Sequence, residues 1–118
     1  MRDIKFRAFD PLDEKMMGPW DWDDIISGEM TIHPSGDYCP PMQYTGLKDK
    51  NGVEIYEGDI VKVRSISVGD YVAQVVFRQG HFAVQNKEDK YGTVAINIPL
   101  QLTVIGNIYE NPELLEAK

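Results

Sequence analysis

The stretch from residue 42 to 63 constrains the fold more than any other part of the chain. It reads MQYTGLKDKNGVEIYEGDIVKV. The pair Asn51-Gly52 tolerates positive φ at both central positions of a tight turn, and strand-type residues lie on either side of it. A second turn at residues 57–59 precedes a β-branched run that begins at Ile60. The stretch therefore predicts a hairpin or tight connection followed directly by a longer strand.

Strand signals continue after this stretch at even spacing. Five segments are predicted, separated by Gly, Pro and polar turn residues: 60–67, 71–78, 81–86, 93–98 and 101–105. Each carries a pair of apolar residues on one face: Val61 and Val63, Val75 and Phe77, Phe82 and Val84, Val94 and Ile96, Leu102 and Val104. The pattern predicts a five-stranded meander with enough apolar surface for a small barrel core.

Both ends of the chain predict additions to this barrel. Residues 4–9 alternate with the period of a strand, residues 10–13 are turn-forming, and residues 15–17 form a returning strand. We expect this hairpin to pack its Phe6 face onto the later sheet. At the other end, Asn111 and Pro112 are typical of a helix start, so we expect a short C-terminal helix with Asn111 as its cap.

Residues 18–41 differ in character, with four prolines, three glycines, two tryptophans and no sustained period. We expect either an ordered excursion with a short strand at 30–32 or a flap, and one helical turn near 23–26. Because loops tolerate variation that a core does not, function specific to this chain is expected here. The predicted organisation is one domain over 1–118: hairpin 1–17, irregular excursion 18–41, barrel 42–110 and helical tail 111–118.

Three blocks of the chain resemble the YopX family of phage and prophage proteins. They are Ile4–Asp10 (IKFRAFD), Gln43–Val61, and Val104–Leu114 (VIGNIYENPEL), in matching order and spacing. The family usually carries Trp where Phe9 stands, which keeps an aromatic residue there. The resemblance implies a mainly β protein with an SH3-like barrel and no established biochemical activity. No catalytic motif accompanies it.

Composition narrows the class of protein. A chain of 118 residues is long enough to bury a core without a disulfide or metal, and its single cysteine, Cys39, excludes an intrachain disulfide. No long apolar run predicts a signal peptide or membrane span, so we expect a cytoplasmic protein. The resemblance to phage and prophage proteins implies that this is the cytoplasm of a bacterial host. The formal charge of −7 opposes non-specific binding to phosphate backbones.

The residues that could bind a metal or perform catalysis do not form a recognisable site. The acidic group Asp21, Asp23, Asp24 and Glu29 lacks the spacing of a calcium loop. Zinc needs about four ligands, and His33, His81 and Cys39 lack ligand-type spacing. No basic neighbour activates Cys39. We therefore expect no enzymatic activity, no metal and no cofactor, although a Cys–His pair assembled by the fold stays open.

Large apolar side chains in or beside the irregular segment suggest a protein-contact surface. They are Trp20, Trp22, Tyr38 and Met42. In an extended chain Trp20 and Trp22 share one face, and exposed aromatic anchors dominate interface energetics. The alternative is that these residues cover an open end of the barrel. The sequence favours a non-enzymatic phage or prophage accessory protein that binds an unknown protein, or another copy of itself, through this loop and exposed strand edges.

A second interpretation is a nucleic-acid-binding barrel. Its residues would be Lys62, Arg64, Tyr71 and Arg78, on neighbouring strands close to His81. Such basic and aromatic sheet surfaces contact phosphates and stack bases in oligonucleotide-binding barrels. The negative overall charge makes this the alternative rather than the main prediction.

Overall fold

The computed structural model describes residues 4–28, 41–66, 69–78, 80–86, 93–95 and 101–115. Strands dominate this part of the chain, which confirms the predicted mainly β fold. The elements are β1 (Lys5–Asp10), β2 (Lys15–Asp21), α1 (Trp22–Ser27), β3 (Met42–Lys48), β4 (Glu54–Tyr56), β5 (Asp59–Val63), β6 (Tyr71–Arg78), β7 (His81–Gln85), β8 (Thr93–Ala95), β9 (Leu102–Asn107) and η2 (Pro112–Leu115).

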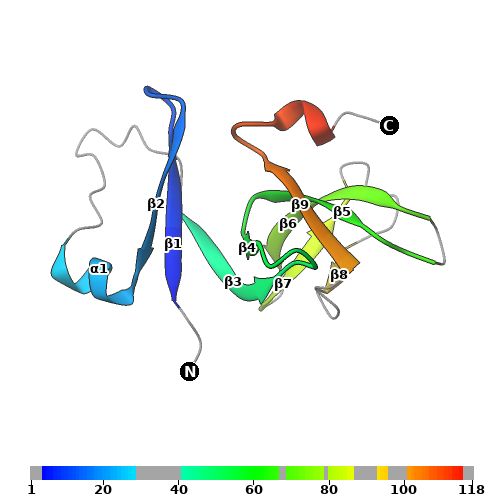
Figure 1. Ribbon diagram of the computed structural model, residues 1–118, viewed down its shortest axis with the longest axis horizontal. Coiled ribbons are helices and arrows are strands. Elements are labelled where there is room, and N and C mark those ends of the chain that lie inside the picture. Colours follow the sequence, from blue (N-terminus) through cyan, green and yellow to red (C-terminus); the bar gives the residue numbers. More distant parts are fainter. Residues whose placement is uncertain are drawn as a thin grey trace.

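The strands form two antiparallel sheets. The N-terminal sheet has the order β2-β1-β3-β4, and the second sheet has the order β8-β7-β6-β5-β9. The five-stranded sheet curls into a half-barrel, with the N-terminal sheet beside it (Figure 1). Strands β5 to β8 form the predicted meander. The last strand departs from it, because β9 returns to pair with β5, placing Val63 opposite Leu102.

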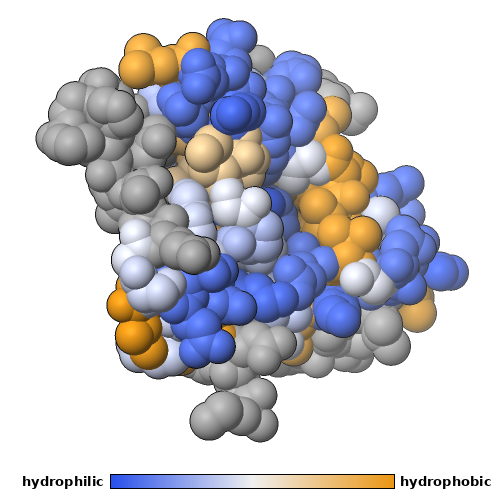
Figure 2. All heavy atoms as spheres, turned by 60° about the vertical axis from the view of Figure 1, so that its left-hand side comes forward, coloured by the Kyte–Doolittle hydropathy of each residue, from blue (hydrophilic) through white to orange (hydrophobic). Residues whose placement is uncertain are grey.

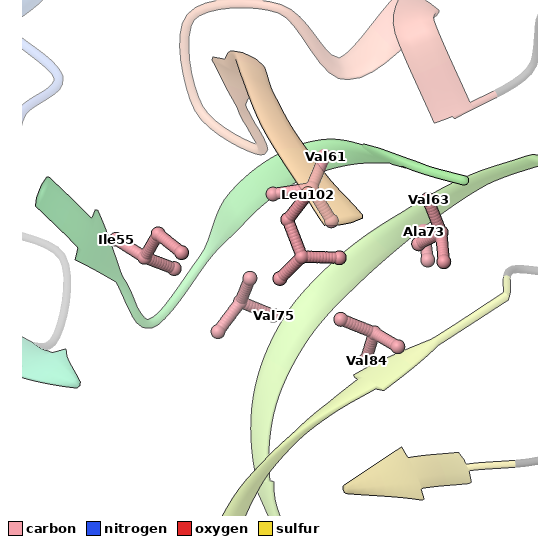
Figure 3. Close-up of a cluster of buried hydrophobic side chains, with 7 residues drawn as sticks. All are labelled: Ile55, Val61, Val63, Ala73, Val75, Val84 and Leu102. Carbon is pink, nitrogen blue, oxygen red and sulfur yellow. The ribbon is translucent and has the colours of Figure 1, made fainter. Parts of the chain in front are cut away.

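The core of the half-barrel is a cluster of small aliphatic side chains (Figure 3). Its members are Ile55, Val61, Val63, Ala73, Val75, Val84 and Leu102, all buried. The prediction that Phe77 belongs to this core is wrong, because it is 46% exposed near the end of β6. There it makes an edge-to-face contact with Phe82, with ring centroids 5.1 Å apart. The side chains of Val94 and Ile96 lie outside the described residues.

The hairpin predicted for residues 43–56 is confirmed as β3 paired with β4. The N-terminal hairpin is also present, but it joins the fold differently from the expectation. Strand β1 pairs edge to edge with β3, with Phe6 opposite Gln43. The hairpin therefore extends the N-terminal sheet, and the β1 side chain that binds the half-barrel is Arg7, which pairs with Asp59. Contact with the C-terminal segment comes from Phe9, which stacks on Tyr109 at 5.4 Å.

The predicted helical turn is confirmed as α1, and the returning strand β2 is longer than expected. Asp21 caps α1: its carboxylate accepts from the N–H of Asp24, whose carboxylate accepts from the N–H of Asp21. The chain therefore changes from strand to helix between Trp20 and Trp22. The prediction that these two side chains share an extended face is wrong for this reason. The strand expected at 30–32 lies outside the described residues.

The C-terminal helix is the 3-10 helix η2. Its start agrees with the prediction in position, since Pro112 is the first helical residue and the Asn111 carbonyl accepts from the N–H of Leu114 at 3.0 Å. The Asn111 side chain differs from the expected cap, because it accepts from the backbone N–H of Asn107 at 3.3 Å. Neither helix in the described part of the chain is long and apolar enough to span a membrane.

Candidate functional site: the exposed face of α1 and the pocket on β6

A buried ion pair joins the N-terminal sheet to the half-barrel. Arg7 of β1 binds Asp59, the first residue of β5, and the two side chains are 14% and 2% exposed. The Arg7 guanidinium also lies over the Tyr56 ring, 4.6 Å from its centroid. Burial raises the pKa of Asp59 although the charge of Arg7 lowers it. We call Lys5, Arg7, Tyr44, Glu54, Tyr56 and Asp59 the ionic junction.

The other members of the ionic junction are partners of one another in an ion pair, a cation–ring contact and a hydrogen bond. Lys5 binds Glu54 at 2.6 Å and lies over the Tyr44 ring at 5.2 Å. The Tyr56 hydroxyl donates to Glu54 at 3.2 Å, and burial is the main cause that raises the pKa of Tyr56. Arg7 Nε is buried without a hydrogen-bond partner among the described residues. The other polar groups named here bind partners within the chain, so the junction is a structural feature.

Two buried aspartates accept hydrogen bonds from backbone N–H groups on the outer strands of the two sheets. Asp59 accepts from the N–H of Tyr56 at 2.7 Å, on β4. Asp49 accepts from the N–H groups of Asn51, Val53 and Val104 at 2.8, 2.9 and 2.9 Å, the last on β9. Strand β2, the other outer strand of its sheet, carries an irregularity in its pairing with β1 around Pro19. These features cover parts of the outer strands β4, β9 and β2, and β8 is the remaining outer strand. Contact through exposed strand edges stays a prediction.

An exposed apolar pair lies on α1. Trp22 is 53% exposed and Ile26 is 66% exposed, and a separation of four residues places them on the same side of the helix. On the side of the molecule in Figure 2, apolar residues form separate groups among polar ones. Any contact made here would depend on a few large anchors such as Trp22.

The other predicted contact residues have different surroundings. Trp20 is partly buried on β2, opposite Phe6. Met42 is only 4% exposed, so its side chain is not available as an exposed anchor. It packs close to Gly58, where an added Cβ would lie 2.8 Å from its sulfur. Tyr38 lies outside the described residues. Of the four predicted residues, Trp22 is therefore the one with a large exposed side chain in the described chain.

The acidic residues beside Trp22 do not assemble a metal site. Asp21 and Asp24 bind each other's backbone N–H groups at the start of α1. No cluster of three potential metal ligands occurs among the residues that the structure describes. His81 is exposed at the start of β7. Glu29, His33 and Cys39 lie outside the described ranges.

The four residues predicted for nucleic-acid binding do not gather into one surface. Lys62 and Arg64 are exposed, and Lys62 lies opposite Val72. Arg78 is six residues further along β6, which is about 20 Å of strand. Tyr71 packs against the aliphatic core and lies opposite Val63, the residue between Lys62 and Arg64. The structure thus separates Arg78 from the other three residues.

A pocket of about 170 Å³ opens on β6. It lies between Gln74–Arg78 of β6, the turn at Glu57-Gly58, the segment Pro41-Met42, and the pair Ile108-Tyr109. Sequence reasoning missed this site because its walls come from four separated segments. Gly58 is the one local signal, since its φ of +84° and its contact with Met42 both favour a residue without a Cβ.

Comparisons with known proteins agree with this architecture. A solved structure of a protein from Enterococcus faecalis is 30% identical, with a TM-score of 0.62, covering 95% of this chain and 97% of that chain. The yopX protein from Bacillus subtilis is 27% identical, with a TM-score of 0.55, covering 93% and 96%. Comparison with curated proteins gives no match. The family model described as YopX protein matches residues 5–116, so this chain belongs to the YopX family.

Proposed function

We propose that this protein is a non-enzymatic accessory protein of a phage or prophage, which works in the cytoplasm of the bacterial host through protein–protein contacts. Membership of the YopX family supports the origin, since the resemblance noted above is to phage and prophage proteins. The observation that carries the contact is the exposed pair Trp22 and Ile26 on α1.

The physical argument is one of unused apolar surface. Covering an exposed aliphatic side chain such as Ile26 contributes roughly 1.5–3 kcal/mol, and tryptophan is among the residues that dominate interface energetics. Within the chain this surface is only partly covered, because Trp22 and Ile26 are 53% and 66% exposed and no residue of α1 is fully buried. A partner that covers Trp22 and Ile26 would recover free energy that folding leaves unused.

The test is capture of partners from a bacterial host lysate by tagged protein, with and without nuclease. Wild type is compared with the double variant Trp22→Ala/Ile26→Ser and with the control Ile66→Ser, which changes a 98% exposed residue outside α1. We expect one stoichiometric protein that survives nuclease, is retained by the control and is lost from the double variant. Equal recovery with all three proteins would overturn the proposal.

The nucleic-acid interpretation is an outcome of the same experiment. Recovery that disappears after nuclease treatment would replace the protein-contact proposal. Attention would then move to Lys62, Arg64 and Arg78, and the affinity should fall steeply as salt concentration rises.

A further inference from the structure

The pocket on β6 has the size of a site for one side chain. Its volume is about 170 Å³. An apolar cavity of about 150 Å³ admits a molecule of the size of benzene, whereas sites for drug-sized ligands and cofactors span roughly 300–1,000 Å³. A single aromatic ring system therefore matches the available space, and a nucleotide or flavin does not.

The lining of the pocket favours an apolar group that carries a neighbouring negative charge. Met42 and Val75 are buried beside the pocket, and Ile108 and Tyr109 add further apolar surface. Arg78 lines it as well, and its side chain is exposed. No carboxylate among the described residues forms an ion pair with Arg78.

The pocket contains one carboxylate, which is already engaged. Glu57 accepts a hydrogen bond from the backbone N–H of Gln43 at 3.1 Å, which holds its side chain at the start of β3. Gln74 adds a neutral polar group. The cation available to an incoming ligand is therefore Arg78, which suits a carboxylate next to the inserted ring.

The chain itself presents a group with this chemistry. Trp22 is exposed, and Asp21 and Asp23, its two neighbours in sequence, are exposed carboxylates. No basic residue occurs in the last turn of α1. The surface of α1 thus combines one large ring with adjacent negative charge. This complements a pocket lined by both apolar and polar groups, beside which the exposed Arg78 guanidinium donates to the Phe77 carbonyl at 3.3 Å.

We propose that the pocket on β6 receives Trp22 of a second copy of the chain, with Asp23 of that copy placed against Arg78. The inference rests on the proposed contact role of Trp22 and names its partner. Helix α1 lies on the far side of the N-terminal sheet from the half-barrel (Figure 1). The two contacting surfaces are therefore separate on each copy. They can join reciprocally in a two-fold dimer or head-to-tail in a ring or a growing chain of copies.

The experiment is sedimentation velocity from about 1 to 100 μM protein, the range in which a micromolar contact becomes populated. Wild type should associate as concentration rises. Trp22→Ala removes the inserted ring, and Arg78→Glu places a negative charge opposite Asp23. Each variant alone should associate at least about tenfold more weakly. The control Ile66→Ser should behave as wild type does.

Mixing the two variants gives the sharper result. The Trp22→Ala variant retains an intact pocket, and the Arg78→Glu variant retains Trp22. In a mixture, Trp22 of the second variant can therefore enter the pocket of the first, and this is the one productive contact. We expect a 1:1 dimer and no larger species. The charge-reversed double variant Asp23→Arg/Arg78→Glu should regain association, because the ion pair is restored with opposite polarity.

Three results would overturn the inference: wild type that stays monomeric at every concentration, association that Trp22→Ala leaves unchanged, or a mixture of variants that forms no dimer. Thermal unfolding of each variant excludes a loss of folding as the cause. If wild type is monomeric while capture from lysate still depends on Trp22, the second-copy inference fails and the proposed function stands. If capture and self-association are both independent of Trp22, both proposals fail.

Discussion

The two sheets of this protein are stabilised by different kinds of contact. The half-barrel encloses aliphatic side chains such as Val61 and Val75, both 0% exposed. The N-terminal sheet adds Ile55 of β4 to this cluster and is joined to the half-barrel through the ionic junction, in which Arg7 binds Asp59 and lies over Tyr56. An aliphatic core tolerates small changes of shape, whereas a buried ion pair loses a great deal when either partner is removed.

We expect the ionic junction to govern the stability of the fold and the surface of α1 to govern recognition. The ionic junction fixes how the N-terminal sheet meets the half-barrel, and that sheet continues into α1 with the exposed Trp22. Substitutions in the junction should therefore change folding strongly. Substitutions on α1 should change association and leave folding nearly unchanged.

The largest effect is expected for Asp59→Ala. It leaves the Arg7 guanidinium buried without its carboxylate and removes the acceptor of the Tyr56 N–H. Loss of one partner of a buried pair costs about 3–5 kcal/mol of unfolding free energy. Urea denaturation measures this cost. As a control, Asp70→Ala removes an exposed pair in which the Lys62–Asp70 distance is 3.9 Å, and it should cost less than about 1 kcal/mol.

The next effect is expected for Gly58→Ala, at the turn before β5. A left-handed φ costs a residue with a Cβ about 1–2 kcal/mol, and here the Cβ would also lie 2.8 Å from the sulfur of Met42. Gly52→Ala is the matched control, because its φ is +82° and nothing lies within 4 Å of the added Cβ. Gly58→Ala should lower the melting temperature more than Gly52→Ala does. Equal effects would show that Met42 moves aside without cost.

Asp49→Asn tests the second buried aspartate through its pH dependence. Although burial opposes its charge, N–H donors from Val104, Val53 and Asn51 hold the pKa of Asp49 below its usual value of 3.8. The ionised group therefore contributes stability above about pH 3.8, and this is lost as pH falls through the lower folded pKa. The amide side chain leaves one N–H unpaired, which costs about 1–3 kcal/mol at neutral pH.

The measurement for Asp49→Asn is thermal unfolding from pH 7 down to pH 2. The difference in melting temperature between wild type and variant should be largest at neutral pH and should narrow below pH 3.8. A difference that stays constant over this range would show that ionisation of Asp49 contributes nothing.

A smaller effect is expected for Ile55→Val in the aliphatic core. The substitution removes one methylene group from a side chain that is 0% exposed. Such changes typically cost about 0.5–1.5 kcal/mol, about a quarter of the cost expected for the ionic junction. Guanidinium denaturation of Ile55→Val beside Asp59→Ala compares the aliphatic cluster with the ionic junction directly. A larger loss for Ile55→Val than for Asp59→Ala would reverse the comparison.

The local features of the fold were predictable from sequence, and the long-range ones were not. Asn51-Gly52 and the alternating apolar residues predict the β3–β4 hairpin and the strands β5 to β7. The return of β9 to β5 depends on contacts between Asp59 and Asn107, 48 positions apart, which periodicity does not report. The same holds for Arg7 and Asp59, 52 positions apart, whose side chains read in sequence as ordinary surface charges.

The candidate site was predicted in part. Its residue type alone indicates Trp22 as a contact residue. The predicted orientation of its side chain is wrong, because the prediction treats residues 20–22 as one extended strand. The spacing of Asp21 and Asp24 is a capping signal, and it would have placed the helix start at Trp22. Met42 was wrong as an exposed anchor, since burial beneath the turn at Gly58 depends on tertiary packing.

The most direct test of the account measures folding and association on the same sample of Trp22→Ala. Because Trp22 is 53% exposed, its removal should change the unfolding free energy by less than about 0.5 kcal/mol, as for other surface substitutions. The self-association measured by sedimentation velocity and the capture of a partner should both be lost. A fall of about 3–5 kcal/mol, the cost of truncating a core tryptophan, or association equal to wild type would contradict the assignment of Trp22 as a contact residue.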